Sequence, residues 1–277
     1  MPSVPSKVAD RLVAGLKRYQ AILSASKTRD AGEADTVTIV KDMLADVFGY
    51  DKYAEITSEH SIKSTFCDLA VKIDGTVRML IEVKAIGIDL KDIHVKQAVD
   101  YAVNQGVNWV ILTNSVTWRI YHVIYSKPIG QELVLDINLL ELDPKSPEDI
   151  ERLYLWCKEG LARTALEDYE AHKQALSRFL IGAILQSEPV LELVRRELRR
   201  VSQLNREAAE IRIEMEQIEA VIVNEVIKRD VLEGDKAEEA RKKVAKAANK
   251  ALRHVSPKLG PKAADLTAQD PQTPIVT

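Results

Sequence analysis

Two consecutive stretches of alternating apolar and polar residues, joined by Asp74-Gly75, constrain the fold of this chain most strongly. In residues 66–73 and 77–84 apolar side chains recur at every second position, which predicts two β-strands. Asp-Gly between such stretches is a strong hairpin signal. For the two apolar faces to coincide, odd-numbered residues must lie opposite odd-numbered ones. A two-residue loop would break this match, so we expect a three-residue loop with Gly75 near the left-handed position of a bulge.

The same alternation places three chemically useful side chains on one surface. In the expected register, Asp68 lies on the same face as Glu82 and Lys84 and is opposite or diagonal to Glu82. Cross-strand neighbours of this kind are roughly 5–8 Å apart, which suits two carboxylates that share a cation. Mg²⁺ prefers oxygen ligands, lowers the pKa of bound water and neutralises charge that grows on a phosphoryl group. A lysine two residues from such a ligand can orient the water or stabilise the transition state.

Two polar side chains on the next predicted helix, over residues 89–104, can complete such a site. Gln97 and Tyr101 lie one helical turn apart and project together, so they can hydrogen-bond a phosphate or a neighbouring ligand. Each part of the set is common by itself, because acid-x-lysine on a strand usually forms a solvated face and surface helices often contain Gln-x-x-x-Tyr. The order and spacing of all five residues together favour a metal-dependent phosphodiesterase.

With these motifs in place, residues 33–125 resemble the N-terminal nuclease domain of type I restriction-enzyme R subunits, within the PD-(D/E)XK superfamily. The resemblance rests on short motifs that follow one another in the family's order. They are Glu33-Ala34-Asp35-Thr36, Asp68, Glu82-Val83-Lys84, Gln97-Ala98-Val99-Asp100-Tyr101-Ala102 as in RecB-like nucleases, Trp109 to Asn114, and Trp118 to Tyr121. One departure is visible, because Cys67 stands where the family name expects proline. That position is not a ligand.

The resemblance implies a fold, an activity and roles for the matching residues. The fold is an α/β, restriction-endonuclease-like mixed sheet flanked by helices. Asp68 and Glu82 would bind the metal, and Lys84 would be the catalytic lysine. Glu33 would be an additional acid near the metal. The implied cofactor is Mg²⁺, with Mn²⁺ as a substitute.

Within the same resemblance, Gln97 and Tyr101 would be auxiliary nucleic-acid contacts, and we expect DNA rather than RNA as the partner. R subunits also contain an ATP-driven motor after the nuclease. This sequence has no Gly-x-x-x-x-Gly-Lys-Ser/Thr phosphate loop, so we expect cleavage that needs no ATP.

Composition narrows the class of protein further. Cys67 and Cys157 are far apart and form no metal-spaced cluster, which argues against a disulfide framework or a zinc site. No apolar run approaches the roughly 20 residues of a membrane span. The net charge of −3 neither favours nor opposes nucleic-acid binding, because binding responds to the local field of a cleft. We expect a soluble cytoplasmic protein that contacts no membrane.

The pattern of helical and strand periodicities divides the chain into an α/β part and an all-α helical C-terminal region. The expected segments are an N-terminal helix within residues 1–29, the nuclease-like domain over 30–143, a helical bundle or coiled-coil-like region over 146–233, a basic helix over 235–255 and a disordered tail over 256–277.

The helical region contains a long apolar stripe, in which apolar residues recur every three or four positions from Leu191 to Val226. A stripe of this length on a charged helix requires a partner helix. We favour a homodimer formed through the 191–226 helix over packing within one chain.

The segment over residues 236–262 contains nine Lys and Arg residues against two Glu, a net charge of +7. It is either a contact to a phosphate backbone or a solvated helix.

Two functions follow for the whole chain. The first is a Mg²⁺-dependent DNA endonuclease of the restriction, defence or repair type. The alternative is a catalytically silent, nuclease-derived binding or scaffolding module that assembles through its helical half.

Overall fold

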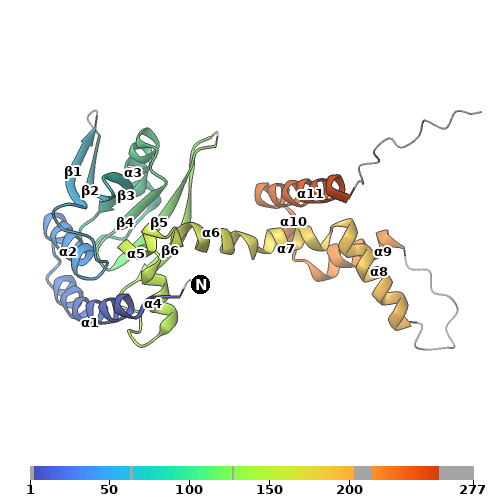
Figure 1. The fold of residues 1–277 in the computed structure, drawn as a ribbon, viewed down its shortest axis with the longest axis horizontal. Helices are drawn as coiled ribbons and strands as arrows, with labels where there is room; N and C mark the ends of the chain where they lie inside the picture. The colour runs from blue at the N-terminus through green and yellow to red at the C-terminus, as the bar shows by residue number, and fades with distance from the viewer. Residues whose placement is uncertain (1–2, 63–64, 127, 203–213, 256–277) are drawn as a thin grey trace, which may run out of the picture. The chain divides into compact units, whose positions relative to one another are not determined.

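The computed structural model describes residues 3–62, 65–126, 128–202 and 214–255. The chain forms two compact units, Met1–Lys173 and Gln174–Thr277. Figure 1 labels the helices and strands of both.

The first unit is built on a six-stranded sheet whose strands lie in chain order from β1 to β6. The strands are β1 (Ile56–Ile62), β2 (Thr65–Ile73), β3 (Thr76–Val83), β4 (Trp109–Thr113), β5 (Thr117–Ile124) and β6 (Gly130–Asn138). Only the β3–β4 pair is parallel. A parallel pair needs a crossover connection, and the helix α3 (Asp92–Gln105) supplies it. The sheet is therefore mixed.

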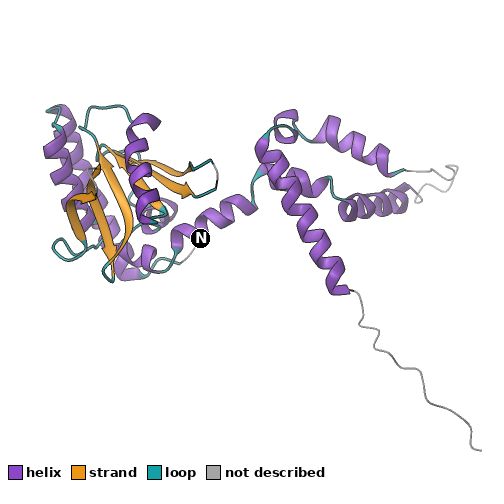
Figure 2. Cartoon of the chain, turned by 90° about the horizontal axis from the view of Figure 1, so that it is seen from above, coloured by secondary structure: helices purple, strands orange, loops and turns teal. Residues whose placement is uncertain are grey.

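Helices cover both faces of this sheet (Figure 2). α1 (Ser6–Thr28) and α2 (Glu33–Asp46) share a buried cluster with odd-numbered strand residues such as Leu69 and Ile81. α3 packs on the other face, against even-numbered residues such as Ala70 and Leu80. The two clusters follow from the period-2 alternation of buried strands. This arrangement confirms the α/β fold class.

The hairpin between β2 and β3 closes differently from our expectation. Ile73 pairs directly with Thr76, so the loop has two residues, and the predicted three-residue loop is wrong. Asp74 and Gly75 have φ angles of 51° and 75°, as a type I′ turn requires. The two apolar faces still coincide, because a register shift between Val71 and Lys72 inserts the extra residue further along the hairpin.

Three further helices belong to the first unit. They are α4 (Pro147–Tyr154), α5 (Lys158–Ala162) and α6 (Ala165–Ala175), which begins in this unit and crosses its boundary. The Ser146 hydroxyl accepts a hydrogen bond from the Asp149 N–H and caps α4, as its sequence predicts.

The boundaries that we expected from the sequence need two corrections. Leu153, Trp156 and Leu161 are buried in the same cluster as the strands, so the compact unit continues to Lys173 instead of ending near residue 143. α1 also contributes to this cluster through Leu12 and other apolar residues, and is part of the sheet unit instead of a separate N-terminal element. In both cases an apolar face is buried on the nearest available core.

The second unit consists of helices. They are α7 (Arg178–Leu185), α8 (Glu188–Ser202), α9 (Met215–Val221), the π-helical turn η1 (Ile222–Val226), α10 (Arg229–Leu232) and α11 (Asp235–Val255). Leu191 of α8 shares a buried cluster with Ile218 and Ile222. In one continuous helix, Leu191 and Ile218 would be about 40 Å apart. The single helix expected over 191–226 is therefore wrong, and much of its apolar stripe packs within the chain.

The basic helix is present as α11, which begins after Gly234 and packs against α7 (Figure 1). The tail predicted over 256–277 lies outside the described residues, as does the part of the apolar stripe in 203–213. No helix in the described part of the chain is both long and apolar enough to cross a membrane.

Candidate functional site

The first carboxylate of the candidate site, Asp68, lies in the middle of β2. The register of the hairpin pairs Leu69 with Ile81, so the next step along the ladder brings Asp68 opposite Glu82. The Asp68 carboxylate accepts a hydrogen bond of 2.7 Å from the backbone N–H of Val83. This bond anchors the carboxylate at the end of β3.

The second carboxylate, Glu82, is almost fully buried, with 6% of its surface exposed. Burial raises the pKa of Glu82, and the charge of Asp68 raises it further, although a hydrogen bond from Lys84 opposes both. Removing a carboxylate from water disfavours its charged form, and so does a second carboxylate nearby. A cation placed between Asp68 and Glu82 would relieve both effects.

Lys84 follows directly after β3, and its side chain returns to Glu82. Its Nζ donates to Glu82 Oε1 at 2.7 Å and lies 3.8 Å from Glu33 Oε2. Burial acts to lower the pKa of Lys84, but the hydrogen bond to Glu82 and the charges of Glu82, Glu33 and Asp68 outweigh it, so the pKa is raised. The ammonium therefore stays charged at neutral pH.

Glu33 is the first residue of α2, and it reaches the site from a part of the chain far from Lys84 in sequence. Its side chain is about half exposed, which leaves the carboxylate accessible from solvent. The backbone N–H of Ile86, after β3, donates to the carbonyl of Ala31, before α2. This bond ties the two connections together and holds Glu33 beside Lys84.

A buried asparagine, to which we assigned no role from the sequence, also supports the site. Asn114 follows β4, and its side-chain amide donates to the carbonyls of Ile86 and Ile88 at 3.3 and 3.0 Å. It thereby holds the connection that follows Lys84. Its position at the carboxyl end of a buried parallel strand is the signal that the sequence offered, because ligand sites gather at such ends.

Gln97 and Tyr101 do not share one environment. Gln97 is exposed on α3, whereas Tyr101 is buried with 1% of its surface exposed. Burial raises the pKa of the Tyr101 hydroxyl, and the nearby Cys67 contributes. Cys67, at the family's proline position, is itself buried, and its thiol donates to the carbonyl of Ile81. Only the Gln97 side chain of this pair is accessible in the structure.

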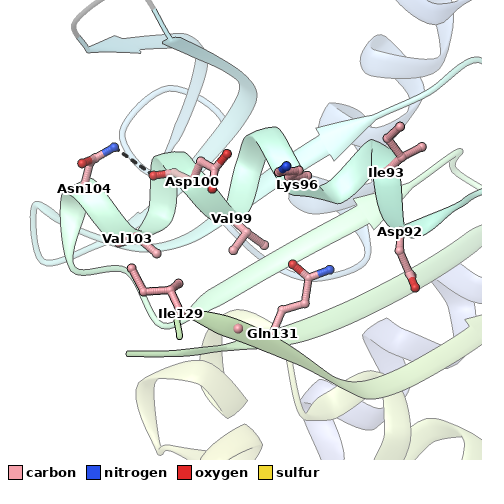
Figure 3. A pocket seen from close by; sticks show the side chains of 10 residues that line it. Asp92, Ile93, Lys96, Val99, Asp100, Val103, Asn104, Ile129 and Gln131 are labelled. Atoms are coloured by element: carbon pink, nitrogen blue, oxygen red, sulfur yellow. Dashed lines mark hydrogen bonds between the residues drawn. The ribbon is translucent and has the colours of Figure 1, made fainter. Parts of the chain in front are cut away.

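A cavity of about 740 Å³ lies on the other side of α3, where the helix faces the start of β6 (Figure 3). Charged and polar residues of α3, including Asp92, Lys96 and Asp100, line it together with Ile129 and Gln131. None of the six candidate site residues lines this cavity. The candidate site is thus a separate surface, formed by the middle of β2 and the end of β3.

The donor set decides which metal the site can hold. Among the residues that the structure describes, no group of three or more His, Cys, Asp or Glu side chains could hold a metal ion. A metal at this site would be held by the carboxylates of Asp68 and Glu82, and its remaining positions would be left to water or substrate. Mg²⁺ binds in this way, through one or two carboxylates, waters and substrate phosphates. The residues fit Mg²⁺ and do not fit a zinc site, which needs a more complete set of protein ligands.

The comparison with protein families agrees with this geometry. The family model described as type I restriction enzyme R protein N terminus matches residues 39–135. The match confirms the resemblance seen in the sequence for this part of the chain. It covers Asp68, Glu82 and Lys84 and both α3 candidates, and it begins after Glu33. No curated protein and no solved structure matches the chain.

Proposed function

We propose that this protein is a metal-dependent nuclease that hydrolyses phosphodiester bonds in DNA, in restriction, defence or repair. The observation that supports this most directly is the cluster of Asp68, Glu82 and Lys84, with a 2.7 Å contact from the lysine to Glu82. A buried carboxylate beside a second carboxylate is costly unless a cation is bound there. The matched family gives the reason to choose DNA as the substrate.

Each residue has a distinct task in the proposed reaction. Asp68 and Glu82 bind the cation, which, when present, lowers the pKa of a bound water and neutralises charge on the phosphate. Lys84 presents an ammonium, charged at neutral pH, that orients the attacking water and stabilises negative charge in the transition state. Glu33 holds the ammonium in place from the side of α2.

Of the two α3 candidates, Gln97 contacts the nucleic acid and neither touches the reacting atoms. Gln97 is exposed and can donate to a phosphate or accept from a sugar. Tyr101 was predicted as a second contact, and its burial suits a residue that positions α3. We therefore expect both Gln97→Ala and Tyr101→Phe to weaken cleavage less than changes at the carboxylates.

The first prediction tests the metal ligands. Glu82→Ala removes an oxygen ligand of the cation, so cleavage of DNA should fall by at least about 10²-fold while DNA binding persists. The measurement compares wild type and variant on single-stranded DNA, double-stranded DNA and RNA, with Mg²⁺ or Mn²⁺, with EDTA, and without ATP. Asp100→Ala, which removes an exposed carboxylate of α3, is the matched control and should cleave like wild type.

The variant Lys84→Ala distinguishes the role of the lysine from the role of the metal ligands. It should lose cleavage to a similar degree but retain metal binding, because the amine is not a ligand. If wild type cleaves no nucleic acid with either metal, or if Glu82→Ala cleaves as fast as wild type, the proposed nuclease activity is wrong.

The second candidate function is a catalytically silent binding or scaffolding module. It is favoured by the hydrogen bond from Lys84, which occupies an oxygen of Glu82 that a metal would need, and by the separate helical unit. This module would bind nucleic acid equally well with and without Mg²⁺ and would cleave none.

Assembly and location are further parts of the proposal. We propose a homodimer that forms through the apolar residues of the 191–226 stripe left exposed in the structure, among them Val201 and Val226. We also propose that the protein acts in the cytoplasm, where a restriction or defence nuclease would meet its DNA.

A further inference from the structure

The charges of the chain are divided unevenly between its two units. Residues 1–173, which include the candidate active site, have a net charge of −5, and residues 174–277 have a net charge of +2. A negative unit does not attract a polyanion by its overall field. Any electrostatic attraction of nucleic acid to this protein must therefore come from local groups or from the helical unit.

Within the helical unit, α11 separates its apolar and basic side chains. Ala237 and Ala240 are buried, and α11 packs on α7. The lysines Lys236, Lys243 and Lys246 are exposed. On a helix of 3.6 residues per turn, the three lysines fall within about 80° of one another, so they share one face of α11. The packing of α11 thus directs its lysines to solvent.

The basic side chains of α11 differ in whether an acidic side chain or a carbonyl group within the unit already binds them. Lys242 lies 3.8 Å from Glu238, and the Arg241 guanidinium donates to the carbonyl of Leu232 at 2.9 Å. For Lys236, Lys243 and Lys246 the described part of the unit provides no ion pair. These three lysines, which we call the α11 lysine face, are the groups available to an anionic partner.

We propose that the α11 lysine face is a nucleic-acid-binding surface that contacts the phosphate backbone of DNA without reading its sequence. Lysines contact phosphates as point charges, and they release counterions from DNA when they do so. The proposal is independent of the nuclease activity, because backbone binding needs neither a metal nor Glu82.

The same helix argues against an anionic membrane as the partner. A helix that lies in a membrane interface needs a large apolar face to insert into the lipid. The apolar face of α11 packs within the helical unit, where Ala237 and Ala240 are buried and Val244 is half buried, so it is not available to a membrane. The exposed residues of α11 in the described part of the chain are basic, acidic or short alanines, and Glu238 and Glu239 are among them. This composition suits contact with a polar surface and not with a lipid interior.

The test measures binding of the full chain to double-stranded DNA in EDTA, at several salt concentrations. Replacing Lys236, Lys243 and Lys246 together with Gln should weaken binding by roughly 10–100-fold at moderate salt. It should also reduce the slope of log K against log salt by about two to three, since each lost phosphate contact contributes about 0.9. The corresponding Lys→Arg triple variant should bind like wild type.

A control variant on the sheet unit removes the same net charge. Lys7, Lys17 and Lys27 are exposed lysines of α1, and their replacement with Gln should leave affinity and slope unchanged. Circular dichroism establishes that α11 stays folded in both triple variants. The proposal is overturned if the α11 variant binds DNA with the wild-type slope, or if the α1 variant loses as much affinity. It is also overturned if the wild type binds vesicles with anionic lipid but not DNA or RNA.

Discussion

At the scale of single residues, one ion pair joins the two ends of the sheet unit. Arg11 of α1 contacts Glu159 of α5 at 2.6 Å, and the same guanidinium donates to the carbonyl of Val47 at 3.0 Å. Hydrogen bonding from Arg11 lowers the pKa of Glu159 from 4.5 to about 2, although partial burial opposes this. The pair therefore links protonation of Glu159 to folding.

This link gives a prediction about pH. A carboxylate with a depressed pKa stabilises the fold above its ordinary pKa, and this stability is lost as the pH falls through the folded pKa. Glu159→Gln should lower the free energy of unfolding by about 1–2 kcal/mol at pH 7, after allowance for solvent screening. The difference between variant and wild type should then shrink between pH 4.5 and pH 2.

Urea unfolding at pH 7 and near pH 3 measures this difference. The control is Glu148→Gln, which changes an exposed acid in the first turn of α4 and should cost no more than about 0.5 kcal/mol. A Glu159→Gln variant whose deficit is the same at both pH values would contradict the linkage.

At the scale of secondary-structure elements, the approach of α5 to the end of α4 depends on one glycine. A Cβ atom on Gly160 would lie 1.9 Å from the carbonyl oxygen of Tyr154 and 3.1 Å from that of Leu155. Both neighbours are backbone atoms, so no side-chain rotation can remove the overlap. Only glycine fits at this position without moving one of the two helices.

Gly160→Ala should therefore destabilise the sheet unit by about 2–4 kcal/mol, because the two helices must separate and disturb the buried Trp156. Thermal unfolding followed by circular dichroism measures the change. Gly130→Ala is the control, since a Cβ there meets nothing within 4 Å. Equal melting temperatures for both variants would show that α4 and α5 adjust at little cost.

At the scale of the whole molecule, the exposed apolar residues of the helical unit bear on whether two copies of the chain assemble. The stripe over 191–226 is partly used within the chain, but Val201 and Val226 remain 60% and 64% exposed. If they form a dimer interface, replacing both with Glu should convert a dimer to a monomer and leave the melting of the sheet unit unchanged. Light scattering at micromolar concentration tests this, and a monomeric wild type would reject the homodimer.

Local patterns in the sequence were sufficient to predict much of the sheet unit. The period-2 alternation placed Asp68 and Glu82 on one face, and the hairpin of β2 and β3 has the parity that this requires. The type of turn was wrong, because a two-residue turn and a bulge at Val71–Lys72 satisfy the same parity as a three-residue loop. Alternation specifies which residues share a face, but it does not specify where an extra residue is inserted.

The sequence alone determined the strands β2 and β3, the helix α3 and which strand residues share the carboxylate surface, because these depend on the order of apolar and polar residues over a short stretch of the chain. Tertiary structure alone showed that Asn114 holds the connection after Lys84 and that Tyr101 is buried. It also showed that Leu191 packs on Ile218 within one chain. These features join residues that are far apart in the sequence. They depend on which apolar surfaces pack together in the folded chain, and the local periodicity of the sequence does not specify this packing.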